Sequence, residues 1–512
     1  MAKEFKRTDR DQSFLLPPDV RDWLPGEHLV WFVIDVIDQL DTARFEASAK
    51  LGGPGRAAYE PRMLLGVLLY GYACGQRSSR QLERLCEVDV AFRVLTGNQV
   101  PDHTTLARFR ARHDAAMADL FAQVLLVCAR AGLGRLGVVA IDGTKIAANA
   151  SLGANAEEDK LRQMAEQILG EAADTDAAED ALFGDQRGDE LPAGWRDRSG
   201  RRDRIKKALD DLSTEREQRQ AAQQSERVAK AERRVAGIEA TLAAQRREVA
   251  AANQARAERA AAGTPVGGPR SVPVEEHTKV RRVRARLDRA QAKLDAERAT
   301  PRPLPPRERA QSRMTTRNTT DPDSRLMPTR NGWLQGFNAQ LAVTDDQIIL
   351  ATALTTQTGD DHQFVPMMTA AVHAAATLAA ARGEPDPAET IGIVLADAGY
   401  HSEANLTAPG PDRLIAPGTG RDQHAQAAEN PVTGPPPPDA TPVAANAHRL
   451  RTPDGHATYK RRSVTVEPVN GHLKDRIGLR RFSRRGLPAA GAELDLAAAV
   501  ANLLKVYRVT PA

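Results

Sequence analysis

The sequence predicts an α/β fold with a mixed β-sheet, and three observations support this class. Apolar residues recur at helical spacing up to about residue 130, and short apolar runs rich in β-branched residues begin at residue 137. A long, charged, Ala-rich tract separates the first of these runs from the others. The chain has 512 residues, of which 41% are hydrophobic, so it can form about three folded units of roughly 150 residues each.

Residues 1–135 are predicted to form a helical N-terminal domain. Pro61 can open a helix, and PDHTTLARFRARH opens a long one in which Arg108 and Arg112 share an exposed surface. A short helix, a turn and this basic helix resemble a helix-turn-helix, so both arginines are candidate DNA contacts. A helical bundle with solvated arginines is the alternative. The expected buried stripe of the long helix consists of Leu106, Phe109, His113, Met117, Leu120, Val124 and Cys128.

The strand pattern begins with GVVAI and resumes at residue 333. WLQGFNAQLAVT and QIILATALTT are expected to form a hairpin that turns at Asp345 and Asp346. A helix over 364–381, the strand IGIVLAD, the strand RLIAPG and a terminal helix ending near Tyr507 follow. Three strands followed by alternating helix and strand describe a mixed sheet flanked by helices, which is the order of ribonuclease H-like (RNase H-like) folds.

Two insertions are predicted to interrupt this core, which then consists of residues 136–152, 321–417 and 459–512. Apolar residues step three and four apart on both sides of the breaker GTPVGGPRSVP, so residues 153–320 are expected to form a coiled-coil-like helical hairpin. Residues 418–458 contain PVTGPPPPDATP and are expected to be a disordered, Pro-rich insertion.

Three acidic residues are candidates for a catalytic metal site. Asp142 closes the run GVVAID, Asp397 closes IGIVLAD, and Glu467 lies in the basic stretch RRSVTVEPVNGHLKDR. Phosphodiester cleavage needs an activated nucleophile and charge stabilisation, which two Mg²⁺ ions held by carboxylates can supply, with Mn²⁺ as a substitute. An acid in any one of these positions is more often a turn or surface residue. The strands that end at Asp142 and Asp397 are expected to be neighbours in the sheet, and this favours one shared metal site.

A further prediction concerns the helix that contains Glu467. Thr465 can cap a helix with Pro468 in its first turn, which would place Glu467 near a helix N-terminus. Lys474 lies seven residues on, about two turns along nearly the same face. A metal ligand with a cation beyond it could hold a DNA backbone, although such basic stretches are more often solvated surfaces.

The remaining composition is consistent with an intracellular, soluble protein. The formal net charge is +4, which allows a polyanionic partner. The three cysteines, Cys74, Cys86 and Cys128, show no CxxC pairing and are expected to be buried thiols in a reducing compartment. No leader and no apolar run long enough to span a membrane are evident, so a cytoplasmic location is expected.

The quoted blocks resemble a known family. IDGTKIAANAS, ADAGYHSEANL and YKRRSVTVEPVNGHLKDRIGLRRFSRRG look like the three catalytic blocks of bacterial insertion-sequence transposases of the DDE class. The stretch YEPRMLLGVLLYGYACGQRSSRQLERLC through PDHTTLARFRARH is similar to the helical domain that precedes this core in one subgroup. The resemblance covers roughly residues 14–150 and 320–510.

Carried over by position, the resemblance implies that Asp142, Asp397 and Glu467 are catalytic metal ligands. It also implies DNA contacts, with Tyr459 and Arg462 less secure because four residues separate Arg462 from Glu467 where related groups often have three. Trp333 fits the sheet core about as well as a DNA contact. The implied or expected DNA contacts beyond Arg108 and Arg112 are Tyr459, Arg462, Lys474, Arg325, Trp333, Arg480 and Arg481.

The leading hypothesis is a transposase that binds the inverted repeats of its own element, cleaves there with Mg²⁺-activated water, and joins the 3′ hydroxyl to target DNA. Double-stranded DNA is the expected partner, with a homodimer or larger assembly because two ends must meet. A transposase-derived DNA-binding protein without catalysis and an RNase H-like nuclease without strand transfer are the alternatives.

Overall fold

The computed structural model describes residues 19–47, 58–167, 196–262, 271–299, 316–330, 332–383 and 391–510. The chain divides into two compact units. Unit 1 consists of Met1–Asn155 and Asn318–Ala512, and unit 2 of Ala156–Arg317. The predicted N-terminal domain and core therefore do not form separate units, because their side chains share one hydrophobic core within unit 1.

The N-terminal part of unit 1 is helical, as predicted. The long helix expected after PDHTT is two helices, α6 and α7, because the backbone leaves helical geometry at His113 (φ −112°). All seven residues of the predicted stripe are nonetheless buried. The elements are the 3-10 helix η1 (Val20–Trp23), α1 (Leu29–Gln39), α2 (Ala43–Glu46), α3 (Pro61–Ala73), α4 (Ser79–Val88), α5 (Val90–Thr96), α6 (His103–Arg112) and α7 (Asp114–Arg130).

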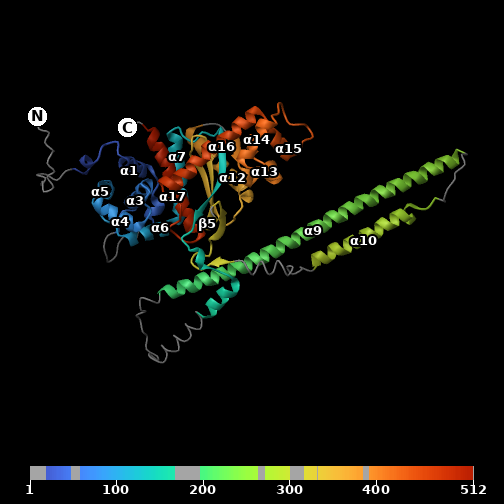
Figure 1. The fold of residues 1–512 in the computed structure, drawn as a ribbon, viewed down its shortest axis with the longest axis horizontal. Coiled ribbons are helices and arrows are strands. Elements are labelled where there is room, and N and C mark those ends of the chain that lie inside the picture. Colours follow the sequence, from blue (N-terminus) through green and yellow to red (C-terminus); the bar gives the residue numbers. More distant parts are fainter. Residues whose placement is uncertain are drawn as a thin grey trace, which may run out of the picture. The chain divides into compact units, whose positions relative to one another are not determined.

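A mixed sheet lies at the centre of unit 1, with β5 antiparallel to β1, β4 and β6 (Figure 1). On its other edge β1 pairs in parallel with β7, and β7 pairs in parallel with β8. The first and fourth predicted strands are therefore neighbours, as expected from their order. The strands are β1 (Val138–Ala147), β4 (Arg325–Thr329), β5 (Gly332–Thr344), β6 (Ile349–Thr355), β7 (Ile393–Ala396) and β8 (Arg413–Ile415). Strand β4 was not predicted from the sequence.

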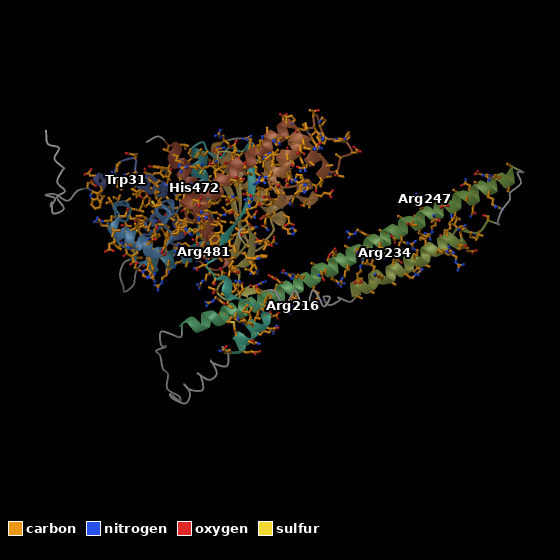
Figure 2. All side chains as sticks on the ribbon, viewed as in Figure 1. Trp31, Arg216, Arg234, Arg247, His472 and Arg481 are labelled. Carbon is orange, nitrogen blue, oxygen red and sulfur yellow. The ribbon has the colours of Figure 1, made fainter. Side chains whose placement is uncertain are left out.

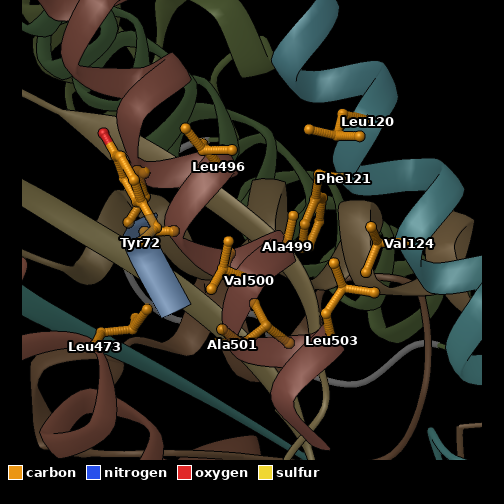
Figure 3. Close-up of a cluster of buried hydrophobic side chains, with 14 of the residues drawn as sticks. Tyr72, Leu120, Phe121, Val124, Leu473, Leu496, Ala499, Val500, Ala501 and Leu503 are labelled. Carbon is orange, nitrogen blue, oxygen red and sulfur yellow. The ribbon is translucent and has the colours of Figure 1, made fainter. Parts of the chain in front are cut away.

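Helices α12 (Phe364–Arg382) and α17 (Leu487–Val509) pack on α7 and on the sheet. Figure 3 shows the apolar side chains of α17, including Val500 and Leu503, beside Leu120 and Val124 of α7. Both α12 (with the residues just before it) and α17 are long and apolar enough to cross a membrane by length and composition. The sequence-based statement that no such run exists was therefore too strong, and packing inside unit 1 accounts for the apolar character of both helices.

The expectation of disorder over residues 418–458 was wrong for this structure. Helices α14 (Gly420–Glu429) and α15 (Pro442–Arg451) occupy much of the segment, after η6 (Ala398–Tyr400) and α13 (Glu403–Thr407). Thr419 and Thr441 cap the two helices with their hydroxyls, and Asn446 bonds to both backbone groups of Ile415 on β8. The proline run thus lies between two capped helices rather than in a disordered insertion.

The helix that carries Glu467 also differs from the expectation. Helix α16 runs from Pro453 to Gly471, so Thr465 lies in its interior and does not cap it. Pro468 has no N–H for the carbonyl of Val464, but Gln347 Nε2 donates to that carbonyl at 3.0 Å, so the helix continues. A π-helical turn, η7 (His472–Arg476), follows and separates Lys474 from the α-helical part.

Unit 2 contains an antiparallel helical hairpin in its described part. Helix α9 (Arg196–Ala261) and helix α10 (Thr278–Ala299) lie side by side, with η3 (Val274–Glu276) before α10 (Figure 1). Leu242 and Val249 of α9 pack against Val280 of α10. The short strands β2 (Asn155–Ala156) and β3 (Arg317–Asn318), at the chain's two crossings between the units, pair with each other. Residues 168–195 of the predicted insertion lie outside the described residues.

The cysteines agree only in part with the expectation of buried thiols. Cys86 and Cys128 are buried, and burial raises the pKa of each to about 12. Cys74 is exposed, because it caps the C-terminal end of α3 rather than lying on its buried face. All three are free thiols.

Candidate active site

Asp142 lies where the pairing between β1 and β7 ends. Ile141 and Ala396 form the last pair of this ladder, so the next residue of each strand, Asp142 and Asp397, follows at the point where the ladder stops. Only 15% of the Asp142 side chain is exposed. Burial raises the pKa of Asp142 to about 6, Arg462 opposes that rise, and the charges of Asp397 and Asp360 add to it. The two predicted aspartates are therefore electrostatic neighbours.

Asp397 caps the short 3-10 helix η6. Its Oδ1 accepts a hydrogen bond from the backbone N–H of Gly399 at 2.9 Å. A Cβ added to Gly399 would lie 3.1 Å from Asp397 Oδ1 and 3.3 Å from Asp360 Oδ2. A side chain at this position would therefore crowd both carboxylates, which approach each other around Gly399.

Asp360 is a site residue that was not predicted from the sequence. Its Oδ1 accepts hydrogen bonds from Asn338 Nδ2 (2.6 Å) and Gln340 Nε2 (2.8 Å), and Lys145 Nζ lies 3.4 Å away. The other amide atom of Asn338, Oδ1, is buried without a hydrogen-bond partner. The sequence does contain a signal for Asp360, the acidic pair in TGDD. This pair follows the third predicted strand, as Asp397 follows the fourth.

Helix α16 contributes a cation and an amide to Asp142. Arg462 Nη1 lies 3.4 Å from Asp142 Oδ1, and Asn470 Nδ2 donates to Asp142 Oδ2 at 2.9 Å. Tyr459, four per cent exposed, also lies beside Arg462, and burial raises the pKa of its hydroxyl. The Oδ1 atom of Asn470 has no hydrogen-bond partner.

Lys474 reaches the same strand from η7. Its Nζ donates to the hydroxyl of Thr144, two residues beyond Asp142. Partial burial, with a smaller contribution from Arg480, lowers the pKa of Lys474. The structure therefore brings together Asp142, Asp397, Tyr459, Arg462 and Lys474 of the predicted set.

Glu467 is not part of this cluster. It is exposed and lines a neighbouring cavity of about 400 Å³, together with Tyr459, Arg462, Ser463 and three residues from α14 and α16 (Arg421, His424 and Lys460). In the part of the chain that the structure describes, no group of three or more His, Cys, Asp or Glu side chains is placed to hold a metal ion. The predicted three-acid ligand set is thus not assembled in this conformation, because Glu467 points to the cavity beside Arg462.

The other predicted DNA contacts lie apart from the acids. Arg325 Nη1 donates to the carbonyls of Pro322, Asp323 and Ser324, so it stabilises the loop before β4. The alternative that Trp333 belongs to the sheet core was wrong, because 65% of Trp333 is exposed near the start of β5.

The four remaining arginines of the predicted set are exposed. Arg108 and Arg112 lie on α6, which Asp102 caps. Arg480 pairs with Asp475, and Arg481 donates to the carbonyl of Ala148. Figure 2 labels Arg481.

His472, at the start of η7, gives a testable pH dependence (Figure 2). Burial and the charges of Arg508, Lys505 and Arg476 lower its pKa from 6.5 to about 4. A lowered histidine pKa means that the unfolded chain binds a proton more tightly, so stability present above pH 6.5 is lost as the pH falls towards 4. We expect His472→Gln to reduce this loss by about 1–2 kcal/mol, measured as the difference in denaturant unfolding between pH 7.5 and pH 4.5. Equal pH dependence in both proteins would contradict the assignment.

Two parts of the chain match known protein families. Residues 18–112 match a family described as Transposase domain (DUF772), and residues 439–507 match a family described as Transposase DDE domain. Both families are transposase domains, so these matches support an insertion-sequence DDE transposase. No curated protein and no solved structure matches the chain.

The two matched regions cover different parts of the transposase. The first contains α1 to α6, with Arg108 and Arg112. The second contains α15, α16 and α17, with Tyr459, Arg462, Glu467 and Lys474. Asp142 and Asp397 lie outside both matched regions of the transposase, so their assignment depends on the geometry described above.

Proposed function

We propose that this transposase binds the terminal inverted repeats of its element and catalyses metal-dependent DNA cleavage and strand transfer in an RNase H-like core. The observation that carries the proposal is the parallel pairing of β1 with β7, after which Asp142 and Asp397 follow together. Strand order β6-β5-β1-β7-β8, with the first pairings antiparallel and the last two parallel, supports the RNase H-like assignment.

The residues present fit a hard divalent cation in their chemistry. Asp142 and Asp397 offer carboxylate oxygens, and the amide oxygens of Asn470 and Asn338 lack hydrogen-bond partners beside this cluster. We propose Asp142, Asp397 and Glu467 as the ligands of Mg²⁺, with Asp360 as a neighbouring carboxylate; Glu467 would have to turn away from the cavity beside Arg462 to reach an ion held by the two aspartates. When bound, Mg²⁺ would lower the pKa of a water molecule and stabilise charge on the phosphate.

The chain's own cations have separate tasks in this proposal. Arg462 balances the charge of Asp142 in the absence of an ion, since burial makes an unpaired carboxylate costly. Arg421, Lys460 and Arg462 line the cavity that Glu467 also lines, and this cavity supports a binding place for a DNA phosphate next to the acids. Lys474, held by Thr144, would contact the backbone farther along the strand.

The test is a reaction of the purified full-length protein with DNA that carries both ends of the element, with Mg²⁺ or Mn²⁺ and with EDTA. We expect nicked or excised ends and joined product only when metal is present. Cleavage without joined product would favour a nuclease without strand transfer. Binding of the ends without any cleavage would favour a DNA-binding protein without catalysis.

Trp333 supports a second, smaller prediction. Its exposed indole can stack on a base or lie against a sugar, which contributes about 1 kcal/mol or more. We expect Trp333→Ala to weaken binding of the element ends about five- to tenfold in a fluorescence anisotropy titration. The melting temperature should stay unchanged because little of the side chain is buried. A large loss of thermal stability with unchanged affinity would show a structural role instead.

Two element ends must be joined in one reaction, so we propose that the transposase acts as a homodimer or larger assembly on DNA. Sedimentation of the protein with and without end-containing duplex measures this directly. A monomer with one duplex as the only species would contradict it.

A further inference from the structure

The helical hairpin of unit 2 carries a basic groove that the proposed reaction does not use. The groove lies between α9 and α10 and encloses about 670 Å³. Three cations from each helix line it, with Ala231, Ile238 and Ala290 among the remaining lining residues and Glu297 as the one acid. The six cations are Arg227, Lys230 and Arg234 from α9, and Arg286, Arg289 and Lys293 from α10.

The six cations form two matched stripes. On each helix they are spaced three and then four residues apart, which places them on one face over about 10 Å of helix. This length corresponds to the rise of about three base pairs. The two stripes lie on opposite walls of one groove, so the arrangement is a row of paired positive positions rather than scattered surface charge.

Like charges that face each other across a helix pair destabilise the pair, and hairpins usually place acids opposite bases. Elsewhere this hairpin does so, since Arg246 pairs with Glu275, Lys279 with Glu248 and Arg298 with Glu232. Among the residues that the structure describes, no ion pair joins any of the six groove cations to an acid. Helix α10 as a whole has eight Lys or Arg against three acids. The groove thus concentrates uncompensated positive charge.

We infer that this groove binds the phosphate backbone of double-stranded DNA. The inference rests on the proposed function for its ligand, but it assigns a second contact surface in unit 2, distinct from the acid cluster of unit 1. Exposed, unpaired lysines and arginines bind phosphates by releasing condensed counterions, so the contact should be independent of sequence and strongly dependent on salt. Arg234 is labelled on α9 in Figure 2.

The test compares two triple variants of the full-length protein. The groove variant is Arg234→Ala/Arg286→Ala/Arg289→Ala, and the control variant is Arg233→Ala/Arg247→Ala/Arg281→Ala. The control removes the same charge from exposed positions of the same two helices that do not line the groove. Alanine favours helix, so circular dichroism and melting temperature should be unchanged in both.

Binding is measured by anisotropy on a labelled duplex of about 40 base pairs of arbitrary sequence, from about 50 to 300 mM NaCl. We expect the groove variant to bind about 30- to 100-fold more weakly near 100 mM salt, and its slope of log affinity against log salt to fall by about two to three. The control variant should stay within about threefold of the unmutated protein, because its three charges lie on other faces of the two helices and do not line the groove.

The outcomes separate the two proposals. Equal losses in the groove and control variants, or no loss in either, would overturn the groove assignment while leaving the proposed function intact. No binding of this arbitrary duplex by the unmutated protein would overturn the groove assignment alone, because the proposed function is tested on DNA that carries the element ends. A lysine variant, Arg234→Lys/Arg286→Lys/Arg289→Lys, keeps the charge and should keep the affinity within a few-fold; its failure would also count against a phosphate contact.

Discussion

Asp142→Asn is expected to reduce DNA cleavage by at least about 1,000-fold, below the detection limit of an end-cleavage assay. The carboxylate of Asp142 lies next to Asp397 at the end of the β1/β7 ladder and is in contact with Arg462 and Asn470. An amide keeps the shape and hydrogen-bonding capacity but removes the negative charge that a hard cation requires. The rate is measured as the fraction of labelled end cleaved with Mg²⁺ over time.

The control for Asp142 is another buried aspartate. Asp495 of α17 also has a pKa raised by burial, and it accepts a hydrogen bond from Thr352 away from the acid cluster. Asp495→Asn should leave the cleavage rate within a few-fold of the unmutated protein. Retained cleavage in Asp142→Asn, or equal losses in both variants, would contradict the role assigned to Asp142.

The same substitution should not destabilise the fold. Burial raises the pKa of Asp142 to about 6, so above that pH the folded protein carries an ionised carboxylate in an unfavourable environment. A raised carboxyl pKa means that this cost is present at high pH and disappears as the pH falls below about 6. The metal-free Asp142→Asn protein should therefore melt at the same or a higher temperature than the unmutated protein at pH 8, because Arg462 keeps Asp397 and Tyr459 beside it when the charge of Asp142 is removed. End binding at that pH should be retained.

Glu493→Ala is expected to lower the free energy of unfolding of unit 1 by about 3–5 kcal/mol. Glu493 lies on α17, with 1% of its side chain exposed, and its Oε1 is 2.5 Å from Arg77 Nη1. Its Oε2 accepts from the backbone N–H of Ser483 at 2.8 Å. Removing this carboxylate leaves the Arg77 guanidinium, itself only 14% exposed, without its acidic partner. Urea unfolding followed by circular dichroism measures the loss.

A double variant separates the charge effect from simple loss of packing. Arg77→Met/Glu493→Leu replaces both charges by apolar side chains, and a buried pair removed as a whole often costs little. We expect the double variant to recover at least half of the stability lost in Glu493→Ala. Recovery should be incomplete, because Arg77 also donates to the carbonyls of Gly478 and Arg481. A double variant less stable than Glu493→Ala would show that packing at this position matters more than charge.

Much of the sheet could be predicted because its strands are short and buried. Runs such as GVVAI and IGIVLA contain few residues that fit any exposed element, and the turn residues beside them mark their ends. The apolar stripe from Leu106 to Cys128 was also correctly placed, since burial depends on spacing rather than on helix continuity. The break at His113 could not be seen because no Gly or Pro marks it.

The surroundings of the acids were less predictable because each local signal has two meanings. Thr465 and Pro468, on either side of Glu467, mark a helix start when the chain enters from a loop. Here the tertiary contact from Gln347 allows Pro468 inside a helix. In contrast, Thr441-Pro442 and Thr452-Pro453 are true helix starts, and the nearby proline run concealed them. The sequence around Asp360 does not indicate which residues contact it, because Asn338 and Lys145 lie on two strands distant from it in the chain.

The insertion between β1 and its antiparallel partner also has a consequence for synthesis of the chain. Ala147 pairs with Gly336 and Val139 with Thr344. The β5 partner of each β1 residue is therefore synthesised 189 to 205 residues later. At about 5–20 residues per second, the apolar strand Val138–Ile141 stays without either neighbouring strand for roughly 10–40 s. During that interval only the N-terminal helices can cover it. Expression at low temperature or with a holdase chaperone should therefore raise the soluble yield more for this protein than for a version with the insertion shortened.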